Sequence, residues 1–149
     1  MRLLSTLLLT LAIAPTLAAP PVATTKPLAE PEWKTPPQAE VYIIEPKDGA
    51  VVKNPVRVVF GLRNMGVAPA GVNHPDTGHH HLLIDTDLPR LDRPIPSSDK
   101  VRHFGGGQTE TRLILLPGTH TLRLLIGDYA HMPHLPPIAS DKVTITVRP

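Results

Sequence analysis

The chain has 149 residues, a formal net charge of +2, and 41% hydrophobic but only 3% aromatic residues. This length is typical of one domain, and the scattered basic residues form no stripe with aromatic side chains, which argues against nucleic-acid binding. The chain has no cysteine, so disulfides, thiol chemistry and a thiolate-bound zinc are excluded. An aliphatic core must therefore provide the stability.

The N-terminal residues 1–19 have the pattern of a secretory signal peptide. Arg2 is followed by an apolar run over residues 3–14 and by small residues before Pro20. The run is shorter than the about 20 apolar residues that span a membrane. We therefore predict a periplasmic or secreted protein with no transmembrane span in its mature form. Residues 20–39 are rich in proline and are predicted to be an extended linker.

The folded domain is predicted to cover residues 40–149 and to consist of strands, because apolar residues alternate between turn residues and no segment has helical periodicity. The predicted strands are 41–44, 51–52, 56–62, 78–85, 111–116, 119–126 and 142–148. Pro117 and Gly118 predict a tight turn that joins two of them into a hairpin, and 142–148 is predicted to be an edge strand. The expected fold is all-β, an immunoglobulin-like antiparallel β-sandwich.

One predicted strand begins with three consecutive histidines. Because side chains alternate along a strand, His79 and His81 share one face and His80 shares the other with two apolar residues, Leu82 and Ile84. These apolar residues mark the core face. We therefore expect His79 and His81 to project from the outer face, about 7 Å apart, and His80 to point inward.

Further histidines occur in the predicted loops. His103 precedes the three glycines 105–107, whose missing side chains allow close approach to a site, and a proline-rich turn contains His131, Met132 and His134. If these loops meet the histidine strand at one end of the sandwich, they complete a metal site. Imidazole suits copper, zinc and nickel, and a thioether favours Cu(I). The candidate metal ligands are His79, His81, His103, His131 and His134.

The sequence predicts different roles for four other residues. His80 and Asp85 are predicted to orient the ligands, because a ligating imidazole usually donates its second N–H to an acceptor. His120 shares a face with apolar residues and is expected in the core, and His74 is expected in solvent.

The leading functional hypothesis is an exported binding module for copper or zinc, with no catalytic motif recognised in the chain. The alternative is a non-catalytic domain that binds a cell-envelope protein and whose histidines bond to its own backbone. A metal-dependent hydrolase or redox enzyme would need an open coordination position and a pocket. Imidazole nitrogens that converge favour the metal site, and nitrogens that splay apart toward the backbone favour the interaction domain.

Five segments of the chain, quoted in chain order at the end of this paragraph, resemble the DUF4399 family of small exported bacterial domains of unknown function. The resemblance extends from about residue 60 to 148 and implies a compact β-sandwich and an exported location, but no established activity. It includes His79, His80, His81, His103, His131 and His134. The segments are "MGVAPAG", "TGHHHLLIDTDLP", "HFGGGQTE", "LPGTHTLRLLIGD" and "HMPHLPPIASDKVTITV".

Overall fold

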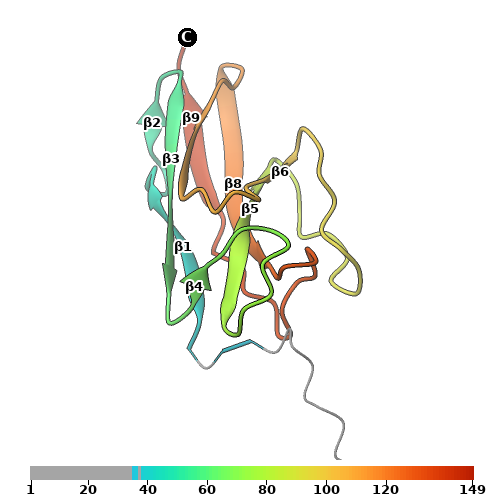
Figure 1. Ribbon diagram of the computed structural model, residues 1–149. Helices are drawn as coiled ribbons and strands as arrows, with labels where there is room; N and C mark the ends of the chain where they lie inside the picture. Colours follow the sequence, from blue (N-terminus) through green and yellow to red (C-terminus); the bar gives the residue numbers. More distant parts are fainter. Residues whose placement is uncertain (1–34, 37) are drawn as a thin grey trace, which may run out of the picture.

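The computed structural model describes residues 35–36 and 38–149, and within them the chain is an all-β sandwich without a helix (Figure 1). The predicted signal peptide and most of the predicted linker lie outside the described residues. The strands are β1 (Glu40–Glu45), β2 (Val51–Val52), β3 (Val56–Arg63), β4 (Gly66–Val67), β5 (Thr77–Ile84), β6 (Val101–His103), β7 (Glu110–Leu113), β8 (Gly118–Gly127) and β9 (Val143–Val147).

The strands form two sheets. The first has the order β1–β3–β7 and is antiparallel. The second has the order β2–β9–β8–β5–β4, and β6 also pairs with β5, farther along the edge that β4 uses. Strand β9 is therefore not an edge strand throughout, because the two residues of β2 pair with its C-terminal part.

The core between the sheets is aliphatic, as the composition predicts. On β3, Val56, Val58 and Phe60 are buried at alternate positions, and they face Leu82 and Leu124 of the second sheet in one apolar cluster. Burying such side chains contributes roughly 1.5–3 kcal/mol each, so this layer stabilises the fold without disulfides.

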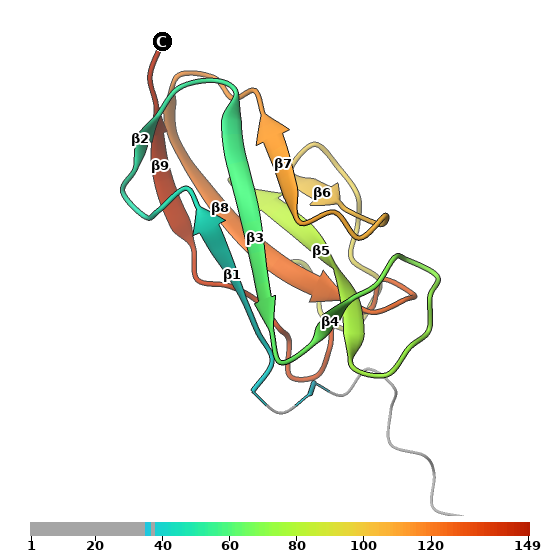
Figure 2. The same cartoon turned by 60° about the vertical axis from the view of Figure 1, so that its left-hand side comes forward.

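The predicted hairpin across Pro117 and Gly118 is wrong. Strand β7 pairs with β3 in the first sheet, whereas β8 lies between β9 and β5 in the second (Figure 2). Leu113 of β7 is paired with Val56 and fully buried, and the Asn54 amide bonds both the N–H and the C=O of Leu115 at 3.0 and 2.7 Å. These contacts hold the end of β7 to the first sheet, so the chain crosses to the other sheet before β8 begins.

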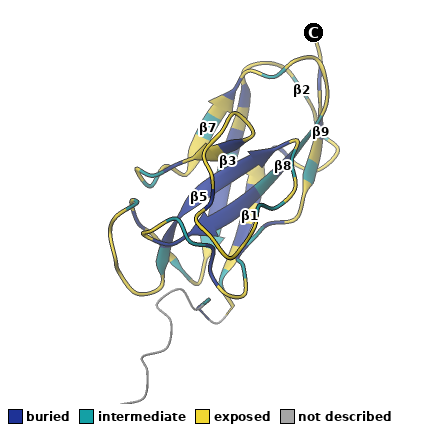
Figure 3. Ribbon diagram, turned by 90° about the vertical axis from the view of Figure 1, so that its right-hand side faces the viewer, coloured by how far each residue is buried: buried dark blue, intermediate teal, exposed yellow. Residues whose placement is uncertain are grey.

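The outer face of the second sheet is covered by loops. The segments between β5 and β6 and between β8 and β9 pass over it, on the side away from β1 and β3 (Figure 1). A second apolar cluster forms beneath them from Leu83, Leu125, Ile95 and Val101. Strand β5 is consequently buried on both faces from residue 78 to residue 84 (Figure 3).

Candidate metal centre

Three imidazoles converge on the covered face of the second sheet. Ring nitrogens of His79, His81 and His103 lie within 4.8 Å of one another. A point therefore exists no more than about 2.8 Å from all three atoms, and ring movements of under about 1 Å would bring each nitrogen to the ~2.0–2.1 Å of a zinc–imidazole bond. Among the residues that the structure describes, this is the group arranged to hold a metal ion.

A fourth imidazole, that of His131, borders this group. Its Nε2 lies 3.2 Å from Nε2 of His103, close to the separation of about 3.3 Å expected for two nitrogens on one tetrahedral ion. The His131 ring centroid is 5.0 Å from that of His79 and 6.0 Å from that of His81. The four rings therefore form one cluster, with His131 on the side away from His81.

The deepest two rings have no hydrogen-bond partner. His79 and His81 are fully buried, and no group in the described part of the chain bonds to Nδ1 or Nε2 of either ring. A buried polar atom without a partner costs about 1–3 kcal/mol. These nitrogens are therefore the feature of the fold that calls for a ligand.

Both buried rings are neutral at physiological pH. Burial, together with the neighbouring His103 and His131, lowers the pKa of His79 to about 4. Burial and neighbouring imidazoles lower the pKa of His81 to about 3. Burial also lowers the pKa of His103. Since a metal ion binds unprotonated imidazole, these rings need not lose a proton before they ligate.

The sheet register brings His103 to the histidine strand. In the pairing of β5 with β6, His103 stands directly opposite His81. On the other side of β5, His79 is paired with Gly127 of β8, where an added Cβ would lie 2.9 Å from Cε1 of His81. The missing side chain of Gly127 therefore provides the space for the His81 ring.

A tight turn holds His131 in place. The buried carboxylate of Asp128 accepts hydrogen bonds at Oδ1 from the N–H groups of Ala130 and Met132, both at 2.8 Å. The N–H of His131 donates to the Asp128 carbonyl at 2.9 Å, and His131 itself has a positive φ of 66°. Ile95 of the covering loop then donates its N–H to the His131 carbonyl at 2.8 Å.

The remaining loops around the cluster are tied to one another. Ala70 donates its N–H to the carbonyl of Gly105, and Gly71 donates to that of Tyr129, at 2.8 and 2.9 Å. The loops after β4, β6 and β8 thus meet at one end of the sandwich. The prediction that the loops carrying His103 and His131 approach the histidine strand agrees with this arrangement.

The predicted outer-face position of His79 and His81 needs one correction. The two rings do share the face opposite Leu82, but the loops over that face bury them completely. Periodicity identifies the face of a strand, and it carries no information on what an irregular loop later covers. His103 is exposed and His131 half-buried, so the cluster extends from the interior to the surface.

Three other predicted site residues lie apart from the group of three. His134 is buried and near enough to influence His79, but its nitrogens are not among those within 4.8 Å. His80 points into the core, as strand alternation predicts, with its ring centroid 5.1 Å from that of Phe60, so it lies on the face opposite the ligands that it was predicted to orient. The predicted orienting role of Asp85 is wrong, because it lies about 13 Å along the strand from His81, at ~3.3 Å per residue.

Asp85 instead bonds His120 at the far end of β5. The Nδ1 of His120 lies 2.7 Å from Oδ2 of Asp85, and its Nε2 lies 2.8 Å from the carbonyl oxygen of Leu116. His120 is therefore satisfied, as predicted, but it is half-buried at the sheet end rather than in the core. His74 is exposed, as predicted.

Two residues that shape the centre escaped the sequence analysis. Gly127 ends an apolar strand and Asp128 begins a loop, so a strand terminator is the ordinary interpretation of the pair. The sequence does contain a signal for Asp128, because an Asp at the start of a loop often accepts hydrogen bonds from the N–H groups two to four residues later, here those of Ala130 and Met132.

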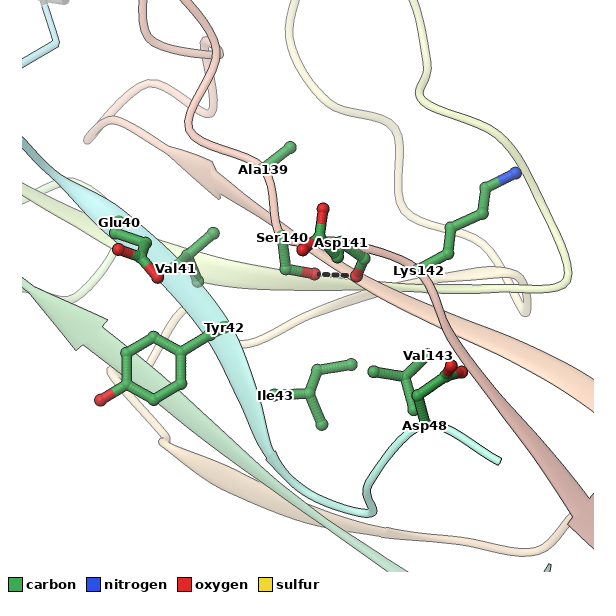
Figure 4. Close-up of a pocket in the computed structure, with 10 residues that line it drawn as sticks. All are labelled: Glu40, Val41, Tyr42, Ile43, Asp48, Ala139, Ser140, Asp141, Lys142 and Val143. Carbon is green, nitrogen blue, oxygen red and sulfur yellow. Dashed lines mark hydrogen bonds between the residues drawn. The ribbon is translucent and has the colours of Figure 1, made fainter. Parts of the chain in front are cut away.

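A separate groove of about 500 Å³ lies between β1 and the segment that leads into β9. Figure 4 shows that Glu40 and Tyr42 border it on one side and Asp141 and Lys142 on the other. No histidine lines it. This groove is therefore distinct from the imidazole cluster.

The fold and the cluster together define a small β-sandwich domain with a group of imidazoles arranged to hold a metal ion. A family model described as a domain of unknown function, DUF4399, matches residues 58–148, and the chain belongs to this family. The match includes every histidine of the cluster. No curated protein and no solved structure matches the chain. Within the described residues, no helix is long and apolar enough to cross a membrane.

Proposed function

We propose that this chain is an exported protein that binds a copper or zinc ion through His79, His81 and His103. The observation that carries the proposal is the pair of buried rings, His79 and His81, whose nitrogens have no partner in the described chain and lie beside a nitrogen of His103. A bound ion would accept a lone pair from each ring and offset part of the cost of burying it.

The donor set selects the metal class. The group consists of imidazoles alone, with no carboxylate among the three ligands. Magnesium and calcium prefer oxygen ligands, whereas imidazole suits copper, zinc and nickel. The donor set therefore indicates a transition metal of this class, and copper and zinc are the two that we propose.

The same geometry weighs against purely structural histidines. An interaction domain with structural imidazoles would bond them to its own backbone, and His120 shows how this chain does so, with partners at both ring nitrogens. His79 and His81 have no such partners among the described residues. His80 also has unpartnered ring nitrogens, but its ring stands alone in the core, whereas nitrogens of His79 and His81 converge with one of His103. It is this convergence, together with the missing partners, that supports a ligand at the cluster.

The export of the protein is part of the proposal. It is supported by the N-terminal pattern of Arg2 and an apolar run followed by small residues. An exported copper or zinc protein without cysteine would bind its ion through imidazole in an oxidising compartment, where a thiol is vulnerable to oxidation.

The test is a titration of the tag-free chain with Cu(II), Zn(II) and Ni(II), followed by thermal unfolding with and without metal. We expect one equivalent to bind with a Kd below about 1 μM and to stabilise the fold by about 2.7 kcal/mol at a free metal concentration of 100 Kd. His103→Ala should weaken binding strongly and leave the fold intact, because this side chain is exposed.

His74→Ala is the matched control, since His74 is exposed and outside the cluster. The double variant His79→Ala/His81→Ala should abolish binding, and its folding is checked by circular dichroism. Affinity weaker than about 10 μM for all three ions, or binding that His103→Ala retains in full, would contradict the proposal.

A further inference from the structure

The four rings of the cluster differ in depth. His79 and His81 are fully buried on the central strand β5, whereas His103 is exposed and His131 is half-buried. Their rings project from the face of the sheet that the loops cover, so neither ring reaches the surface while those loops stay in place. An ion must therefore enter and leave on the side of His103 and His131.

These two outer rings are held differently. His103 belongs to β6, stands opposite His81 in the sheet, and fills the space beside Gly105, where an added Cβ would lie 2.3 Å from its Cε1. Its ring centroid is 4.9 Å from that of His79 and 5.1 Å from that of His81. His103 is thus placed as firmly as a surface ligand can be.

His131 lies at the border of the cluster. Its nitrogens do not belong to the group within 4.8 Å, yet its Nε2 is 3.2 Å from that of His103. An ion bound to Nε2 of His103 would therefore have Nε2 of His131 at the distance of a second ligand of a tetrahedral ion. A rotation of the ring would suffice to bind or to free the ion.

The backbone beneath His131 favours such ring movement. The bonds of Asp128 and Ile95 fix the turn, so the side chain can rotate while the loop stays in place. Rotamer changes of partly exposed side chains take picoseconds to nanoseconds. The turn holds His131 at a φ of 66°, in the left-handed region that is strained for a residue other than glycine.

We propose that His131 is a fourth, exchangeable ligand of the ion. It occupies the outward coordination position at rest, and because its ring is half-buried at the surface end of the cluster, it leaves that position when the ion is taken up or released. Three fixed imidazoles then keep the ion while the fourth position changes its occupant. This inference rests on the proposed function of the same site.

The test uses the full mature chain loaded with Cu(II) and the variant His131→Gly. Glycine adopts a positive φ without strain, so this variant keeps the turn and should unfold at a urea concentration no lower than the parent chain. We expect it to bind Cu(II) about 10-fold more weakly and to release it to a chelator at least about 10-fold faster. Free imidazole at millimolar concentration should restore the electron paramagnetic resonance spectrum of the Cu(II)-loaded variant, and its rate of Cu(II) release, to those of the parent chain.

The outcomes separate this inference from the proposed function. If the parent chain binds none of Cu(II), Zn(II) and Ni(II), both are overturned, and if it binds Zn(II) but not Cu(II), the release measurement is made with Zn(II). If it binds Cu(II) and loses it in His103→Ala, while His131→Gly releases the ion at the parental rate or ignores added imidazole, this inference alone is overturned. His74→Gly serves as the control for removal of an exposed imidazole.

Discussion

The place where Gly105 would carry a side chain is occupied by the ring of His103. A Cβ at Gly105 would lie 2.3 Å from Cε1 and 2.6 Å from Nε2 of that ring, whereas one at the adjacent Gly106 would meet only the amide end of Gln108, the nearest atom at 2.8 Å. Neither glycine has a positive φ. The two neighbours therefore offer a matched pair of substitutions.

We predict that Gly105→Ala displaces the His103 ring and weakens binding of Cu(II) or Zn(II) by about 10–100-fold, the range typical for residues that orient a ligand. Gly106→Ala should change the affinity by less than about 2-fold, because it displaces only the exposed Gln108 amide, at the loss of its hydrogen bond from the Gly106 N–H, and no imidazole. Metal titration of both variants measures the difference. Equal affinities in the two variants would show that the position of His103 does not matter for binding.

A second prediction concerns His80, which is buried in the core against Phe60. The Gln108 backbone lies near the His80 ring but forms no full hydrogen bond with it. His80→Leu replaces the ring by an apolar side chain of similar volume and should therefore stabilise the chain by about 1 kcal/mol at pH 7. Since the ring points away from the metal cluster, metal affinity should stay within about 3-fold of the parent chain. Urea unfolding and metal titration check the two parts.

The same variant has a defined pH dependence. Burial lowers the pKa of His80 to about 4 from 6.5, so below pH 6.5 the unfolded chain takes up a proton that the folded chain does not. The parent chain therefore loses stability relative to His80→Leu as the pH falls from 6.5 to about 4, by up to about 1.4 kcal/mol per pH unit. A gap that stays constant between pH 7 and pH 5 would refute this assignment.

Periodicity and composition are sufficient to predict the sandwich, because β1, most of β3 and β9 bury alternate residues against an aliphatic core. The same rule correctly placed His79 and His81 on one face and His80 on the other. It could not predict the burial of the pair, since that depends on Ile95 and other residues of a loop without periodicity.

The sequence also could not show how β6 and β7 pair. Strand β6 has only three residues, too few for an alternating pattern, yet its pairing with β5 is what brings His103 to the cluster. The turn at Gly118 resembles a hairpin locally, but Asn54 holds Leu115 to the first sheet from 61 residues away. Contacts at such sequence separation leave no local signal.

A third prediction concerns the turn that carries His131. Asp128→Ala removes the acceptor for the N–H groups of Ala130 and Met132 and should cost about 1–3 kcal/mol of stability. Asp128→Asn keeps a carbonyl oxygen in that place and should cost less than about 1 kcal/mol. Hydrogen exchange of the two amides should accelerate in the alanine variant and stay near the parental rate in the asparagine variant. Equal hydrogen-exchange rates of these two amides in both variants would contradict the role of the Asp128 carboxylate in holding the turn.

The last prediction concerns the ion pair of His120 and Asp85 at the other end of β5. The hydrogen bond to Asp85 raises the pKa of His120. Burial alone would raise the pKa of Asp85, but the hydrogen bonds from His120 and from the Thr121 N–H outweigh it and lower this pKa. His120 makes its full contribution to folding stability below its unfolded pKa of about 6.5, and this contribution is lost as the pH rises through the folded pKa of His120. The contribution of Asp85 is present above its unfolded pKa of about 3.9 and is lost as the pH falls through the folded pKa.

Asp85→Asn tests this pair with little disturbance, since asparagine tolerates the positive φ of 50° at this position and keeps an acceptor for the Thr121 N–H. The parent chain should exceed the variant in stability by up to about 1 kcal/mol near pH 5.5, because the pair is partly exposed, and by less at pH 9. Urea unfolding at the two values measures the gap, and nuclear magnetic resonance titration of His120 should show its pKa falling in the variant. A gap that widens toward pH 9 would contradict the assigned sign, because neutral His120 gains nothing from the charge of Asp85.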